Sequence, residues 1–252
     1  MNPLTILIVI VLLVLFYMFL RYLLSDPYTL QSIQSGKNAS TISASSLAKN
    51  GEAEASNFAY SVWFYVNDWN YRYGEPKVII GRMGAISPTG AGSIKGISGV
   101  NPCPAIVLGP VENNVSVSLA CYPGANPSTK STSTNSVIHT CMVSNIPIQK
   151  WVNLVASVYG RSMDIYIDGK LVRTCLLPGI AQINSNADLH VTPKGGFDGW
   201  TSKIQYYPTA LNPQEVWNIY AAGYSNGLSL FGAYSVQVLL KENGNEKSSI
   251  TF

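Results

Sequence analysis

An uninterrupted apolar run at the N-terminus is the feature that most constrains how this chain can fold. Residues 4–20 read LTILIVIVLLVLFYMFL, without a charged residue, glycine or proline, and Arg21 follows directly. About 20 such residues form a helix that crosses the ~30 Å hydrocarbon core of a bilayer. An arginine at the end of such a helix extends its guanidinium to the headgroups at little cost. The sequence therefore predicts one transmembrane helix within residues 1–24, with a membrane anchor that runs from Leu4 to Leu20 and ends at Arg21.

A cleaved signal peptide is the alternative for this segment. The run is too long for one, no Lys or Arg precedes it, and no small-residue cleavage site follows. The basic residues Arg21, Lys37 and Lys49 all follow the span, which favours a C-terminal domain on the cytosolic side. Two Asn-x-Ser triplets, at Asn38 and Asn114, match the glycosylation pattern and argue for the opposite orientation. The sequence favours the cytosolic side without deciding the question.

The next segment, residues 25–56, has a different composition. It is rich in Ser, Ala, Asn and Gly and contains few large apolar side chains. Such a segment buries too little apolar surface to offset the entropy lost on ordering. We expect a flexible or extended polar spacer, or else an arm that becomes ordered only against a partner.

From residue 57 onward the dominant pattern has a period of two, which is typical of strands that face a core on one side. In residues 151–159, apolar side chains occupy every second position. The Asp168-Gly169 pair predicts a tight hairpin turn, because both central residues of that turn need a positive φ. Two-residue closure would place Asp164 opposite Arg173 as a cross-strand ion pair. Further strands are predicted at 60–66, 77–81, 188–191 and 203–207, with a hairpin at 104–121.

One helix interrupts these strands. Asn212 is suited to the N-cap, Pro213 to the first helical position and Glu215 to the third, and Gly223 can close the C-terminus. Many short strands separated by turn residues are typical of a sandwich. We therefore predict an all-β fold for residues 57–226, a two-sheet antiparallel β-sandwich with one short helix. Alternating apolar residues in 227–252 predict an added β-arm at the C-terminus.

Four cysteines are candidates for disulfide bonds: Cys103, Cys121, Cys141 and Cys175. None belongs to a C-x-x-C pair and the chain has only two histidines, so a zinc site is not expected. Cys103 and Cys121 are equidistant from Glu112, at the middle of a predicted hairpin, so one interpretation pairs them with each other and pairs Cys141 with Cys175. All three connectivities remain open, as does a set of four buried thiols.

Charge and motifs exclude several classes of function. Charged residues make up 12% of the chain and the net charge is +3 without a basic block, so nucleic acid is not an expected partner. The chain has no G-x-S-x-G or H-E-x-x-H motif, and its glycine-rich segments lack the spacing of a phosphate-binding loop. It also lacks the clustered strand carboxylates of sandwich glucanases. We predict a non-enzymatic protein without a cofactor.

The aromatic stretch in residues 68–75 is the strongest candidate for a ligand site. Trp69, Tyr71 and Tyr73 alternate there, and Arg72 lies between two of them. Their rings could stack on sugars, and we predict that these four residues form a ligand-binding group. The alternative is an edge loop whose rings pack on the sandwich or on a neighbouring protein.

Several stretches resemble the laminin-G-like branch of the concanavalin A-like lectin/glucanase superfamily. They are FAYSVWFYV at 58–66, IPIQKWVNLVASVY at 146–159 and DIYIDGKLV at 164–172. Residues 197–207 and 210–217 are similar to the closing strand and short helix of that family. The resemblance covers roughly residues 57–224 and implies a jelly-roll sandwich. It says less about function, because the family includes sugar binders, adhesion modules and structural domains. Some members bind calcium, but no calcium ligands can be placed here, so calcium binding stays open.

The combination of an anchor, a polar segment and this sandwich is similar to proteins of large nucleocytoplasmic DNA viruses. The stretch WFYVNDWNYRYGEPK at 63–77 carries that resemblance most clearly. Virions of that group hold an internal membrane beneath an icosahedral shell. The resemblance implies a single-pass minor capsid protein that tethers this membrane to the shell, with capsid or membrane-associated proteins as partners. Its C-terminal domain would face the capsid, on the cytosolic side during assembly. The alternative is a carbohydrate-binding, lectin-like module displayed on a membrane.

Overall fold

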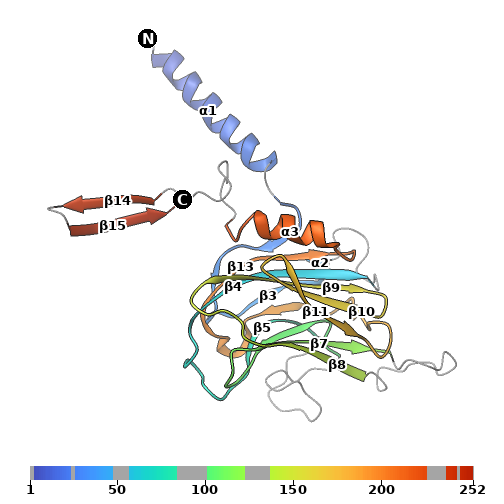
Figure 1. Ribbon diagram of the computed structural model, residues 1–252. Helices are drawn as coiled ribbons and strands as arrows, with labels where there is room; N and C mark the ends of the chain where they lie inside the picture. Colours follow the sequence, from blue (N-terminus) through green and yellow to red (C-terminus); the bar gives the residue numbers. More distant parts are fainter. Residues whose placement is uncertain are drawn as a thin grey trace. The chain divides into compact units, whose positions relative to one another are not determined.

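Figure 1 shows the computed structural model of the chain. The structure describes residues 3–23, 26–47, 57–83, 101–122, 137–225, 237–242 and 245–251. The chain divides into two units, one formed by Tyr28–Ser225 and the other by the terminal segments Met1–Pro27 and Asn226–Phe252. The first unit holds the sandwich.

Two antiparallel sheets make up this unit. The larger sheet has the order β1 (Thr29–Gln31), β13 (Asp198–Tyr207), β4 (Phe58–Asp68), β9 (Trp151–Tyr159), β10 (Ser162–Ile167) and β11 (Lys170–Leu176), and β2 (Gln34–Ser35) also pairs with β13. The smaller sheet has the order β3 (Ser40–Ile42), β12 (Leu189–Val191), β5 (Lys77–Arg82), β6 (Ala105–Leu108), β7 (Val115–Cys121) and β8 (Val137–Val143). Within the described residues, the helical segments of this unit are α2 (Ala44–Leu47), the 3-10 turn η3 (Pro193–Gly195) and α3 (Pro213–Ala221).

The core lies between the two sheets and is filled by alternate residues of their strands. Val62 and Phe64 of β4 and Leu154 of β9 are fully buried there, together with Ile106 of β6 and Val117 of β7. Because side chains alternate across a strand, each sheet turns one apolar face inward. The predicted two-sheet antiparallel sandwich is therefore confirmed.

A second, smaller apolar cluster lies on the outer face of the larger sheet, beneath α3. Val216 of α3 packs there with Val155 of β9 and Tyr166 of β10. The side chain of Asn212 accepts a hydrogen bond from the backbone N–H of Glu215, whose carboxylate accepts one from the backbone N–H of Asn212. This capping box begins α3 as the sequence predicts, and Figure 1 shows the helix beside β13 and β4.

The hairpin of β10 and β11 turns where predicted but has a different register. Asp168 and Gly169 both have a positive φ, at 50° and 74°. An irregularity between Ile165 and Tyr166 then shifts the pairing, so that Arg173 lies opposite Ile165. The bulge adds a residue that simple two-residue closure does not count.

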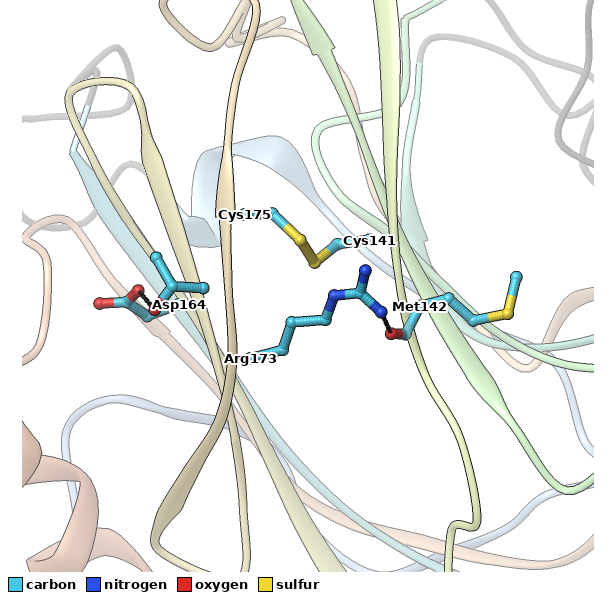
Figure 2. The surroundings of a disulfide bond; sticks show 6 residues. Cys141, Met142, Asp164, Arg173 and Cys175 are labelled. Atoms are coloured by element: carbon cyan, nitrogen blue, oxygen red, sulfur yellow. Dashed lines mark hydrogen bonds between the residues drawn. A yellow bond between two sulfur atoms is a disulfide. The ribbon is translucent and has the colours of Figure 1, made fainter.

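The predicted ion pair between Asp164 and Arg173 is therefore wrong. Asp164 lies opposite Thr174, whose hydroxyl donates to the Asp164 carboxylate at 2.6 Å. Arg173 points the other way and donates to the carbonyl oxygen of Met142 in β8, also at 2.6 Å (Figure 2). The arginine thus connects the two sheets rather than two neighbouring strands.

The first part of the predicted polar spacer belongs to the sandwich. β1 and β2 pair with β13, and β3 pairs with β12. Leu30 and Ile42 pack against the core, and Leu47 is buried in it. Short edge strands take their hydrogen bonds from a sheet that already exists, so they need few apolar side chains of their own. Residues 48–56 lie outside the described part.

The cysteines form one of the two candidate bonds. Cys141 of β8 is joined to Cys175 of β11, which links the edge strands of the two sheets (Figure 2). Cys103 and Cys121 are buried free thiols. The β6–β7 register pairs Ala105 with Ser118, and its continuation sets Cys103 opposite residue 120 rather than 121. Burial raises the pKa of Cys103 to about 12 and also raises that of Cys121, so neither is a reactive thiolate at neutral pH.

In the terminal unit the structure describes a helix and a hairpin. α1 spans Pro3–Leu23, and its described side chains, residues 7–19, are all exposed. Within the described residues, no helix satisfies the length and hydropathy that a membrane crossing requires. β14 (Gln237–Glu242) and β15 (Asn245–Thr251) pair antiparallel as a sheet of their own, within the segment predicted to be a β-arm.

Removal of the Cys141–Cys175 bond is expected to destabilise the sandwich by about 3–4 kcal/mol, because the bond closes a 34-residue loop in the unfolded chain. Chemical denaturation of the Cys141→Ser/Cys175→Ser double variant in detergent measures this loss. Cys103→Ala is the control, because it truncates a buried thiol and leaves the bond intact. A double variant no less stable than the wild type would contradict the expectation.

Candidate functional site

The loop that follows β4 contains the four residues singled out as a ligand-binding group. Trp69 packs against the core, and its indole N–H donates to the carbonyl oxygen of Val111 at 3.0 Å. The ammonium of Lys77 lies 5.0 Å from the centroid of the Trp69 ring. Both contacts hold the indole within the domain.

Tyr71 and Arg72 also have partners within the domain. The Lys37 ammonium lies 4.9 Å from the centroid of the Tyr71 ring. Arg72 forms an ion pair with Glu75 at 2.5 Å and donates to the carbonyl oxygen of Lys194. Tyr73 is the most exposed of the four, at 58%. The loop therefore looks more like a packed edge than an open site, and ligand binding by these residues stays a prediction.

An ion pair beside this loop joins β13 to the turn after β2. The Lys37 ammonium lies 2.6 Å from the Asp198 carboxylate, which also accepts a hydrogen bond from the Asn67 amide at 3.0 Å. These two hydrogen bonds, that of Lys37 first, lower the pKa of Asp198 below its usual value. The pair fixes the start of β13.

A row of aromatic rings crosses the outer face of the larger sheet and continues onto α3. We define the aromatic row as Trp200, Tyr65, Trp151, Tyr224, Trp63, Tyr220 and Trp217. Neighbouring ring centroids along it are 5.8, 5.8, 4.4, 6.0, 5.7 and 5.5 Å apart, in that order. Two of these contacts are parallel stacks, Trp151 on Tyr224 and Trp63 on Tyr220.

Strand alternation explains the positions of the row's strand residues. The residues of β4 that face the core include Val62 and Phe64, so Trp63 and Tyr65 face outward. Trp63 and Tyr65 lie directly opposite Asn153 and Trp151 of β9. Tyr65 also lies opposite Trp200 of β13 on its other side. The pairing of three adjacent strands thus brings Trp200, Tyr65 and Trp151 together.

The other members, Trp217, Tyr220 and Tyr224, depend on α3 and on the segment after it. Tyr224 is held in place by the Ser202 hydroxyl, which donates to its carbonyl oxygen at 2.6 Å. Lys203 donates to the carbonyl oxygen of Ala222 at 3.4 Å. At the far end, a Cβ on Gly169 would lie 2.9 Å from a ring carbon of Trp217, so the hairpin turn needs glycine for this contact as well as for its φ.

Exposure varies along the row in a way that suits a binding surface. Trp217, Trp200 and Tyr224 are 46%, 43% and 38% exposed, whereas Trp63 is only 4% exposed. The buried ring thus supports neighbours that turn part of their surface to solvent. Large rings that lose little entropy on contact, with a polar tip on each, are the side chains that dominate recognition surfaces.

Sequence reasoning singled out Trp69, Tyr71, Arg72 and Tyr73 and missed the aromatic row, because it followed residues that are close together in the chain. The aromatic row draws on residues from 63 to 224. Its strand members carried a signal, since Trp63, Tyr65 and Trp151 stand at positions of the outward face. Nothing local places Tyr224 among them.

No cluster of three or more His, Cys, Asp or Glu side chains suited to a metal occurs within the described residues.

No family model and no curated protein matches the sequence. Solved structures do match, and all three described here are binding domains of botulinum neurotoxins. The receptor-binding domain of the C/D mosaic serotype has a TM-score of 0.53 at 12% identity, covering 76% of this chain and 42% of that chain. The serotype D binding domain has a TM-score of 0.51 at 10% identity, covering 77% and 42%. The serotype DC binding domain in complex with SialylT has a TM-score of 0.50 at 15% identity, covering 76% and 42%.

At these identities the likeness shows the fold alone. It supports the two-sheet antiparallel sandwich predicted from the sequence. This chain matches less than half of the length of those domains, so their binding properties are not transferred with the fold.

The pKa of Asp198 is expected to rise toward its ordinary value in Lys37→Met, because the strongest hydrogen bond to the charged carboxylate is lost. The stability that the lowered pKa contributes is present above the unfolded pKa and is lost as pH falls through the folded one. A carboxyl NMR titration measures the shift. Lys37→Arg keeps the charge and serves as the control, and an unchanged pKa in Lys37→Met would show that Asn67 alone sets the value.

Proposed function

We propose that this chain is a non-enzymatic, lectin-like binding module that recognises a carbohydrate on its aromatic row. The observation that carries the proposal is the exposure of Trp200 and Tyr224 at 43% and 38%. Trp200 contacts Tyr65 edge to face, and Tyr224 is stacked on Trp151. A sugar presents an apolar face of C–H groups and a rim of hydroxyls. Exposed ring faces bind the first, and the indole N–H and phenol O–H at the ring tips bind the second.

The rigidity of the row supports the same proposal. Tyr65 and Trp151 are supplied by hydrogen-bonded strands, and Tyr224 is held through its backbone by Ser202. Side chains fixed before binding lose little rotamer freedom when a ligand arrives, which favours affinity for a small polar ligand.

The fold likeness is consistent with a binding module and adds no catalytic expectation. The three similar structures are named as binding domains, and one of them is in complex with SialylT. The ligand class proposed for this chain rests on its own aromatic row.

We further propose that α1 holds the module on a membrane. The run over residues 4–20 supports this, because every residue in it is uncharged and nearly all are strongly apolar. The charge bias after the run favours a cytosolic module, and formation of the Cys141–Cys175 bond there would need a dedicated oxidase.

A minor capsid protein that tethers an internal virion membrane to the shell is the second candidate function. The observation that favours it is the pair of edge strands β8 and β11, on which most side chains are exposed and many are apolar. Such edges suit contacts with other proteins. A cross-linking map of the full chain in its native membrane or particle distinguishes the two candidates, because only the capsid role requires shell proteins as neighbours.

Trp200→Ala is expected to weaken glycan binding by about tenfold, the effect of losing one stacked ring. The full chain in nanodiscs, applied to a glycan array with and without calcium, identifies the ligand, and titration of each variant measures the loss. Tyr159→Ala is the matched control, since Tyr159 is a 71% exposed aromatic residue outside the aromatic row. No binding in either condition, or equal binding by Trp200→Ala, would refute the assignment.

The wild-type chain is expected to remain in the membrane pellet after alkaline carbonate extraction. Leu12→Arg is expected to release a substantial fraction, because a charge near the middle of a spanning helix costs about 2.5–3.5 kcal/mol. Leu12→Ala is the control for the change in size. Complete release of the wild type into the supernatant would rule out the anchor.

A further inference from the structure

The edge strands on the two sides of the sandwich differ in length. On one side the edge strands are β1, β2 and β3, which have only two or three residues each. On the other side they are β8 and β11, with seven residues each. Very short edge strands are a common way in which proteins prevent edge-to-edge association. One side of this domain has that protection and the other does not.

The long edges also expose apolar side chains. On β8, Met142 is 45% exposed, Val137 44% and Ile138 37%. On β11, Leu176 is 74% exposed, Leu171 51% and Val172 46%. Among the described residues, β8 has β7 as its only neighbouring strand.

The edge strands β8 and β11 are joined by a disulfide and a hydrogen bond. The Cys141–Cys175 bond and the hydrogen bond from Arg173 to the Met142 carbonyl both cross between them (Figure 2). A carbonyl oxygen accepts two hydrogen bonds, so Arg173 leaves capacity on Met142 for a partner strand. A fixed edge loses less entropy on pairing than a mobile one.

We propose that β8 pairs with β8 of a second copy of this chain, so that the smaller sheet continues across a two-fold axis. The sequence of β8, VIHTCMV over Val137–Val143, carries no acidic or permanently charged residue. Full antiparallel overlap of two such strands puts the axis at the central residue, Thr140. This arrangement is closed, because each copy uses the same surface.

The cross-strand pairs in that arrangement are favourable. Ile138 faces Met142 of the second copy, Val137 faces Val143, and Thr140 faces its own equivalent. Ile138, Thr140 and Met142 are exposed in the single chain, so each gains contact at the junction. Apolar and Thr–Thr pairs of this kind stabilise antiparallel sheets.

The other long edge does not offer the same fit. The central residue of β11 is Arg173, and full overlap of two β11 strands would place this arginine opposite itself. Like charges directly opposite each other destabilise a sheet. The choice of β8 thus follows from the charges on the two strands.

A cysteine at the axis tests the register. Thr140→Cys in the full chain, expressed in membranes and oxidised mildly, is expected to give a disulfide-linked dimer on a non-reducing gel. Thr41→Cys is the matched control, because Thr41 is an exposed threonine on β3, the short edge of the same sheet. His139→Cys, one residue from the axis, is expected to cross-link much less. Equal cross-linking at all three positions, or none at Thr140→Cys, would overturn the proposal.

A second measurement needs no new cysteine. Sedimentation of the full chain in detergent is expected to show a dimer that persists at high salt, since the paired strands carry no permanent charge. Ile138→Lys is expected to weaken it by about tenfold, because an exposed lysine is a natural block to edge pairing. Formation of the Cys141–Cys175 bond in the variant reports that it still folds. A wild-type monomer, or a dimer that Ile138→Lys leaves unchanged, would refute pairing through β8.

Discussion

The two-residue alternation of β4 is the constraint on which the rest of the structure depends. Tyr60, Val62 and Phe64 face the core, so Ser61, Trp63 and Tyr65 must face outward. One strand therefore supplies part of the core and the centre of the aromatic row. A slip of one residue in its pairing with β9 and β13 would bury the wrong set on both faces. The stability of the sandwich and the geometry of the candidate site are for this reason set by the same hydrogen-bond register.

The outer face of the larger sheet carries buried polar side chains next to the aromatic row. Ser61 and Asn153 are buried beneath α3, where the Asn153 amide donates to the Ser61 hydroxyl at 3.2 Å. The Ser157 hydroxyl and the backbone of Leu211 exchange hydrogen bonds nearby. These contacts fix α3 on the sheet without a second large apolar core. The helix can therefore carry Trp217 at the surface, while the half-buried Tyr220 stacks on Trp63.

Local rules predicted the parts of the fold that depend on residues near each other in the chain. The capping residues of α3 and the positive φ at Asp168-Gly169 follow from such rules, and both are observed. The bulge does not, because the extra residue in β11, Val172, carries no local turn signal and two-residue closure does not count it. The short strands in residues 29–42 could not be predicted from the sequence for a related reason. They form only by pairing with the edges of β12 and β13. The aromatic row combines both cases: its strand members follow from alternation, and Tyr224 follows from a tertiary contact.

Low charge is a property that the aromatic row and the long edge strand β8 share. Charged residues are 12% of the chain, about half the usual share, so few lysines are available to protect edge strands. On β11 the two cations are Lys170, beside the turn, and Arg173, which is committed to Met142. On β8 no permanent charge is present. A sandwich built this way keeps a neutral surface that suits sugars and apolar partners, and the same neutrality removes the electrostatic penalty that would otherwise keep identical edges apart.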